Sequence, residues 1–178
     1  FMEKVDQRII QPTVNGLAKE EIPYKGFIFL GLIKVKDEPY VIEYNVRMGD
    51  PETEVVLPRL KNDLVELLMA AGKGELDKHT TRVDPRAAVT MVLVSGGYPG
   101  DYKKGVKISN STNSKETLLF HSGTTEENSS IITAGGRVFA ITSLAETIAE
   151  ARDASMRGAE KVLFTGKYFR KDIGFDLI

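Results

Sequence analysis

Apolar residues recur at helical spacing near the start of the chain. Val5, Ile9, Ile10 and Val14 fall on one side of a 3.6-residue period, and polar residues separate them. Because such a stripe marks the buried side of a helix, the pattern predicts a short amphipathic helix over residues 3–17.

Two runs rich in β-branched and aromatic residues follow, over residues 26–35 and 40–47. The polar stretch 36–39 separates them and ends in proline. Two such runs joined by a short polar turn predict a β-hairpin, which is the strongest local signal in the sequence.

The next segment contains helix signals. Asp50 can cap free backbone amides and Pro51 suits the first position of a helix, which Pro58 then stops early. We expect Asn62 to cap a second helix over residues 63–71. Its predicted buried stripe consists of Leu64, Leu67, Leu68 and Ala71, and Gly72 and Gly74 end it.

Residues 73–84 are polar and are interpreted as a linker between a first part, 1–72, and a second part, 85–178. The second part shows short β-type runs separated by clusters of Gly, Asn and Ser. We expect strands at 87–94, 106–108, 117–121, 130–133 and 136–142, and a turn at Glu126-Glu127. The capping box Ser143-Leu144-Ala145-Glu146 predicts the start of a last helix that runs toward Lys161.

Composition narrows the function. The 24 basic and 25 acidic residues leave a net charge of −1, which disfavours binding to nucleic acid or acidic membranes. The apolar runs are too short to span a bilayer. The absence of cysteine excludes disulfides and thiolate sites, and it suits a reducing cytoplasm. The opening residues, Phe1 to Val5, do not resemble a signal peptide, and we expect them to belong to the middle of a longer chain.

Candidate chemistry lies on the second strand of the hairpin. The period of two places Glu43, Asn45 and Arg47 on one face. A carboxylate and an amide oxygen suit Mg²⁺, which shares its ligands with nucleotide phosphates, and a guanidinium can hold an anion. Spacing alone favours the alternative of a solvent-facing strand edge.

Two further segments carry charged candidates. The stretch Gly49 to Glu54 can present carboxylates to an amine, although local signals alone favour an ordinary cap and acidic first turn of a helix. Arg170, Lys171 and Asp172 can close over an anionic substrate, and a solvated charged tail is an equal alternative. The glycine pairs at 96–97 and 135–136 fit no nucleotide-loop motif and are interpreted as turns.

Taken together, these motifs resemble the phosphoribosylamine-glycine ligase family of ATP-grasp enzymes. The resemblance spans nearly the whole chain and is most specific in the Glu-x-Asn-x-Arg-x-Gly-Asp-Pro-Glu run. The matching segments are 24–27, 41–60, 63–67, 95–102, 121–124, 135–138 and 170–174.

The resemblance implies an α/β fold, with mixed α+β character. It would comprise the C-terminal part of an ATP-grasp domain followed by a small β-rich domain with one main helix. It also implies that ATP phosphorylates glycine and that 5-phosphoribosylamine attacks the acyl phosphate. By position, Glu43 and Asn45 match Mg²⁺ or Mn²⁺ ligands. Arg47, Asp50 and Glu52 fall in the substrate-facing loop and are assigned to catalysis.

The resemblance leaves some expectations open. Met48 stands where an aromatic residue is expected. The family's N-terminal domain and its glycine-rich lid have no counterpart in this sequence, so we expect no ligase activity from it alone. We expect a cytoplasmic monomer with small-molecule substrates, for which Arg170 and Lys171 are the binding candidates. The rival interpretations are another ATP-grasp enzyme, such as a purine-pathway carboxylase, and a non-catalytic binding or scaffold domain.

Overall fold

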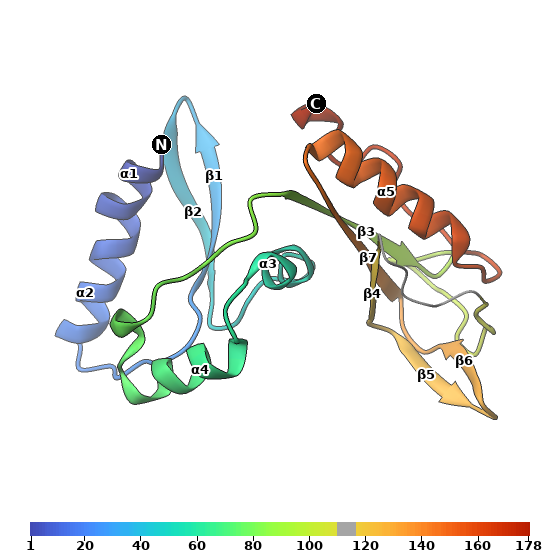
Figure 1. The fold of residues 1–178 in the computed structure, drawn as a ribbon, viewed down its shortest axis with the longest axis horizontal. Coiled ribbons are helices and arrows are strands. Elements are labelled where there is room, and N and C mark those ends of the chain that lie inside the picture. The colour runs from blue at the N-terminus through green and yellow to red at the C-terminus, as the bar shows by residue number, and fades with distance from the viewer. Residues whose placement is uncertain (110–116) are drawn as a thin grey trace. The chain divides into compact units, whose positions relative to one another are not determined.

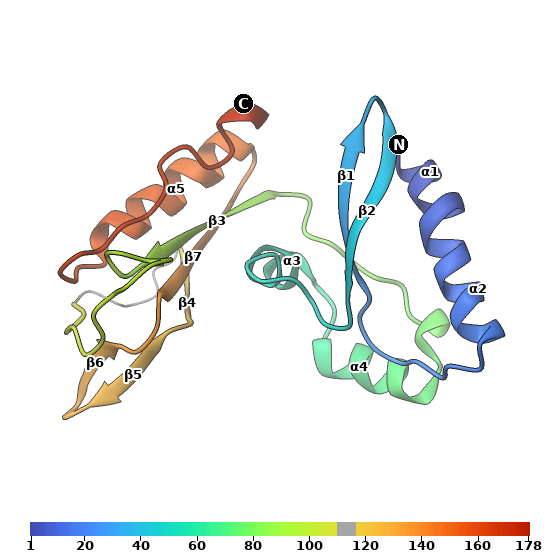
Figure 2. The same ribbon diagram turned by 180° about the vertical axis from the view of Figure 1, so that it is seen from behind.

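The structure is a computed structural model that describes residues 1–109 and 117–178, so the Asn- and Ser-rich stretch predicted to separate two strands lies partly outside it. The chain divides into two compact units, residues 1–50 with 62–82 and residues 51–61 with 83–178. The division at 1–72, 73–84 and 85–178 stays a prediction. Figures 1 and 2 show the ribbon from opposite sides.

In the first unit, a continuous helical run packs on a β-hairpin. The run comprises α1 (Met2–Val5), a π-helical turn (Asp6–Ile10) and α2 (Gln11–Lys19). Val5 and Ile9 are buried, and both views show the helices along one side of the hairpin. The wide turn lies just before Pro12, which has no N–H to donate. The predicted helix is therefore confirmed.

The hairpin pairs β1 (Phe29–Val35) with β2 (Glu38–Asn45) in antiparallel register, as predicted. Lys36 and Asp37 form its turn with φ of 48° and 66°, the left-handed backbone conformation of the turns that two-residue hairpins favour. A bulge follows, because Gly31 pairs with Glu43 while its neighbour Leu32 pairs with Val41.

Helix α4 (Leu64–Lys73) completes the first unit and corrects the predicted cap. Asp63, not Asn62, accepts the amides of Val65 and Glu66. Asn62 instead donates to the carbonyl of Thr80 and accepts from the N–H of Arg82, which ties the segment after the 3₁₀ turn (Leu76–Lys78) to the residues before α4. In the predicted stripe, Leu64, Leu67 and Ala71 are partly buried, but Leu68 is exposed. Gly74 ends the helix, whereas Gly72 lies within it.

The second unit is built around a three-stranded antiparallel sheet with the order β3-β7-β4. Its strands are β3 (Ala87–Val94), β4 (Leu118–His121) and β7 (Arg137–Ala145). Helix α5 (Ile148–Lys161) covers one face, and the sheet and helix together bury a core that includes Met91, Leu93, Phe139, Ile141 and Ala151.

The start of α5 was wrongly predicted. Ser143 and Ala145 belong to β7, where Ala145 pairs with Ala87, the first residue of β3. Thr147 is the cap, and its side chain and that of Glu150 form a reciprocal capping box. The sequence carries two consecutive cap signals, Ser143 to Glu146 and Thr147 to Glu150, and strand pairing with β3 decides between them.

A small hairpin pairs β5 (Thr124–Glu127) with β6 (Ser130–Thr133). The sequence pattern predicts β6 but not β5. Glu126 and Glu127 lie in β5, and the turn is at Asn128-Ser129, with φ of 48° and 58°. The predicted strand at 106–108 makes only an isolated bridge, between Lys107 and Ile132.

Helix α3 (Thr53–Arg59) packs on β3 and β7 within the second unit. Its predicted start was wrong, because Glu52 occupies the N-cap position and residues 50–52 form a turn. The predicted early stop is confirmed, since the helix ends directly after Pro58. A last 3₁₀ turn (Phe175–Leu177) lies near the end of the chain.

The end of α3 is joined to the segment before β3 through Asp84. Arg59 donates to the Asp84 carbonyl at 3.1 and 3.2 Å. The Asp84 carboxylate accepts from the Arg86 guanidinium at 3.0 and 2.9 Å, and Lys61 lies 3.8 Å away. The hydrogen bonds from Arg86, and to a smaller extent the charge of Lys61, hold the pKa of Asp84 well below its usual range.

A depressed carboxyl pKa stabilises the fold only while the group is ionised. This contribution is complete above the unfolded pKa of about 3.9 and is lost as the pH falls through the lower folded pKa. We therefore expect Asp84→Asn to lower the thermal unfolding midpoint at pH 7, and the difference from wild type to shrink below about pH 4. Calorimetry across this range measures it, with the exposed Asp77→Asn as control. An equal difference at pH 3 and pH 7 would contradict the assignment.

Candidate functional site

The first candidate site lies at the end of β2, where Glu43 and Asn45 project from the same face. The amide nitrogen of Asn45 donates to Glu43 Oε1 at 2.9 Å. Glu43 lies over Gly31 on the paired strand, because a Cβ at position 31 would stand 2.8 Å from its Cγ. A side chain at position 31 would displace the carboxylate, so the bulged hairpin and the glycine together place this pair.

The surroundings of the two side chains differ. Glu43 is exposed, whereas Asn45 is partly buried and borders a cavity of about 190 Å³. The apolar side of that cavity is formed by Leu17 of α2 and by Ile28 and Val46, which flank the hairpin strands. The structure therefore brings the predicted pair together but leaves Glu43 open to solvent.

The donor set of this pair suits a hard divalent cation. Glu43 supplies a carboxylate, and Asn45 uses its amide nitrogen, not its oxygen, in the bond between them. Two protein oxygens are few for Mg²⁺, which completes its shell with water and substrate phosphates. Within the described residues, no group of three or more His, Asp or Glu side chains could hold a metal.

The loop after β2 carries the three predicted catalytic residues. Arg47 is exposed and donates to the carbonyl of its neighbour Met48 at 3.0 Å. Asp50 is the last residue of the first unit's opening segment, while Glu52 occupies the N-cap position of α3 in the second unit without a capping side-chain bond. The structure thus places Arg47 and Asp50 in one unit and Glu52 in the other.

The predicted substrate-binding tail, residues 168–174, follows the edge of β3. Tyr168 forms an antiparallel bridge with Val94. Arg170 donates two hydrogen bonds to Asp172, at 2.9 and 2.7 Å, and this pairing lowers the pKa of the Asp172 carboxyl. Lys171 is exposed. The guanidinium of Arg170 is therefore already paired, and an anion would have to compete with Asp172.

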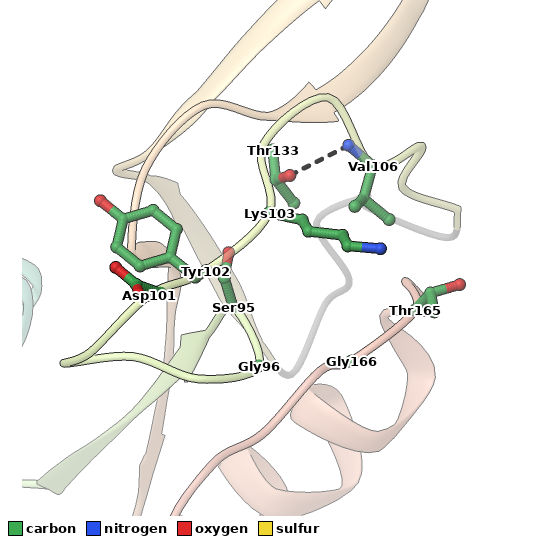
Figure 3. A pocket seen from close by; sticks show the side chains of 9 residues that line it. All are labelled: Ser95, Gly96, Asp101, Tyr102, Lys103, Val106, Thr133, Thr165 and Gly166. Carbon is green, nitrogen blue, oxygen red and sulfur yellow. Dashed lines mark hydrogen bonds between the residues drawn. The ribbon is translucent and has the colours of Figure 1, made fainter.

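A second cavity, of about 450 Å³, was missed by sequence reasoning. It lies beside the end of β3 in the second unit, and Figure 3 shows the residues that line it. Ser95-Gly96 was interpreted only as a turn. The remaining signal, a lysine-rich stretch at 103–107 close after a glycine pair, is too common to identify a pocket in a sequence.

Comparison with known families places this geometry in a class. Residues 1–53, which include the helical run and the hairpin, match the model described as the phosphoribosylglycinamide synthetase ATP-grasp (A) domain. The biotin carboxylase domain of the 2-oxoglutarate carboxylase from Hydrogenobacter thermophilus has the same fold at a TM-score of 0.62 and 16% identity, over 93% of this chain and 38% of that one. The fold and the hairpin define an ATP-grasp protein of α/β class.

Residues 88–176 match the phosphoribosylglycinamide synthetase C domain. The chain belongs to the phosphoribosylglycinamide synthetase family. It is 41% identical to the phosphoribosylamine-glycine ligase of Caldanaerobacter subterraneus over 97% of its length and 41% of that protein. The ligase structure from Thermotoga maritima matches at a TM-score of 0.83 and 38% identity, over 96% of this chain and 42% of that one.

The chain spans about two fifths of the length of the curated relatives it matches. None of the described helices is both long and apolar enough to cross a membrane.

Proposed function

We propose that this chain supplies the C-terminal part of an ATP-dependent ligase that joins glycine to 5-phosphoribosylamine in purine biosynthesis. The observation that carries the proposal is the bonded Glu43–Asn45 pair on β2, in a chain of this family. Relatives named phosphoribosylamine-glycine ligase match over nearly the whole chain, which supports the same reaction.

The reaction has two balanced steps. A glycine carboxylate oxygen attacks the γ-phosphorus of ATP, and ADP leaves. The amine nitrogen of 5-phosphoribosylamine then attacks the carbonyl carbon of the glycyl phosphate, phosphate leaves, and the nitrogen gives up a proton. The protein need form no covalent bond with the substrates, so its contribution is alignment and the stabilisation of charge.

Each candidate residue has a role in this scheme. Glu43 and Asn45 would hold Mg²⁺ or Mn²⁺, which when bound neutralises phosphate charge. Arg47, Asp50 and Glu52 would orient the carboxylate and the amine of the substrates. Arg170 and Lys171 would contact an anionic substrate group, after Arg170 exchanges Asp172 for it. We also propose a cytoplasmic location and a monomeric state.

The test is a hybrid ligase in which this chain replaces the matching segment of the Caldanaerobacter enzyme. We expect the hybrid to form product, measured as ADP release that requires both glycine and freshly made 5-phosphoribosylamine, while the isolated chain forms none. A folded hybrid without turnover would contradict the proposal. Turnover with bicarbonate in place of glycine would favour a carboxylase instead.

A further inference from the structure

The cavity beside β3 has the size of a ligand site and no role in the scheme above. Its volume, about 450 Å³, lies within the range of about 300–1,000 Å³ that is usual for small-molecule pockets. Segments distant in sequence line it, namely Ser95, Gly96, Asp101, Tyr102, Lys103, Val106, Thr133, Thr165 and Gly166. All of them belong to the second unit.

One wall consists of two glycine backbones in close contact. A Cβ at position 96 would stand 2.7 Å from the carbonyl oxygen of Gly166, so only glycine permits this approach. Among the described residues, the N–H groups of Gly96 and Gly166 have no hydrogen-bond acceptor. Free backbone amides beside a cavity are suitable donors to an anion.

Two almost fully buried hydroxyl groups face the same space. Thr133, which is 1% exposed, accepts a bond from the backbone N–H of Val106 at 3.1 Å. Ser95, which is 4% exposed, donates to the carbonyl of Gly135 at 3.0 Å. Because a hydroxyl both donates and accepts, Thr133 keeps a hydrogen for which the described residues provide no acceptor.

The charged lining residues separate to opposite sides. In Figure 3 the ammonium group of Lys103 extends toward the side of Thr165, whereas the Asp101 carboxylate lies on the other side, near the ring of Tyr102. Within the described residues neither side chain forms an ion pair. The cavity therefore has one end suited to an anion and one end suited to hydroxyl or amine donors.

We propose that this cavity binds the phosphate monoester of a small hydroxylated molecule. The phosphate lies at Lys103, Thr165 and the amides of Gly96 and Gly166, and the hydroxyl groups donate to Asp101. The choice of a pentose phosphate as the molecule rests on the proposed function, whereas the phosphate end rests on the cavity alone.

The test is calorimetric titration of the full chain with ribose 5-phosphate, inorganic phosphate and ribose. We expect the first two to bind and ribose not to bind. Lys103→Met should raise the dissociation constant for both phosphates at least tenfold, because its ammonium is the only cation among the described residues that line the cavity. Lys104→Met is the matched control, since it removes the same charge from an exposed neighbour outside the lining. It should change the constants less than twofold.

Asp101→Asn tests the hydroxyl-binding end of the cavity independently of the phosphate end. It should weaken ribose 5-phosphate about threefold or more and leave inorganic phosphate unchanged. Equal losses from Lys103→Met and Lys104→Met, or equal effects of Asp101→Asn on the two phosphates, would overturn the proposal. So would the absence of saturable phosphate binding by a chain with its normal unfolding midpoint. These titrations need neither ATP nor glycine, so a hybrid ligase that fails to turn over leaves their result intact.

Discussion

Replacement of Glu43 by glutamine in the hybrid ligase is expected to lower kcat at least hundredfold, or about 2.7 kcal/mol at 1.36 kcal/mol for each tenfold change. Glutamine keeps an oxygen that can accept the bond from Asn45, so the hairpin should retain its shape. It lacks the charge that attracts a divalent cation, and the metal concentration needed for half-maximal rate should rise as well.

The measurement is steady-state turnover across a range of Mg²⁺ and Mn²⁺ concentrations. Glu66→Gln, which removes an exposed carboxylate of the same unit from α4, is the control and should retain wild-type rates. A Glu43→Gln hybrid that keeps more than half of the turnover at unchanged metal dependence would remove Glu43 from the site.

The largest effect on stability is expected from Phe139→Ala, at about 3–5 kcal/mol. Phe139 is fully buried in β7, the central strand of the sheet, and its ring packs edge-to-face with the His121 ring at a centroid distance of 4.8 Å. Alanine would leave a cavity between the sheet and α5, because neighbours on three strands and a helix cannot all move inward.

Urea unfolding measures the loss as a lower midpoint at an unchanged slope. Leu163→Ala is the control, because Leu163 is 52% exposed, and its cost should stay within about 0.5 kcal/mol. A loss below about 1 kcal/mol for Phe139→Ala would mean that the core does not depend on this ring.

The positions that sequence reasoning predicted correctly are those that local forces decide. The first hairpin is an example, because its strands are adjacent in sequence and a two-residue turn joins them. The shared face of Glu43 and Asn45 follows from strand periodicity alone. The bulge, and the packing of the Glu43 side chain against Gly31, depend on how β1 pairs with β2.

The errors cluster where a distant segment decides between local alternatives. Ser143 and Thr147 both precede a glutamate by three residues, but pairing of β7 with β3, more than fifty residues earlier, extends the strand through Ala145 and leaves Thr147 as the cap. Likewise Glu126 and Glu127 have polar side chains typical of a turn, yet pairing with Ser130 and Ile131 makes them a strand.

By itself, the sequence determined the first hairpin and the shared face of Glu43 and Asn45, because each depends on neighbours within a few residues. The class of fold came from the resemblance of its motifs to a known family. Only the tertiary structure decided that Arg170 is paired with Asp172 and that residues 95–96, 101–103, 106, 133 and 165–166 line one cavity. The physical reason is that segments far apart in the chain must pack side by side to enclose a cavity. No local sequence pattern shows which distant segments will meet.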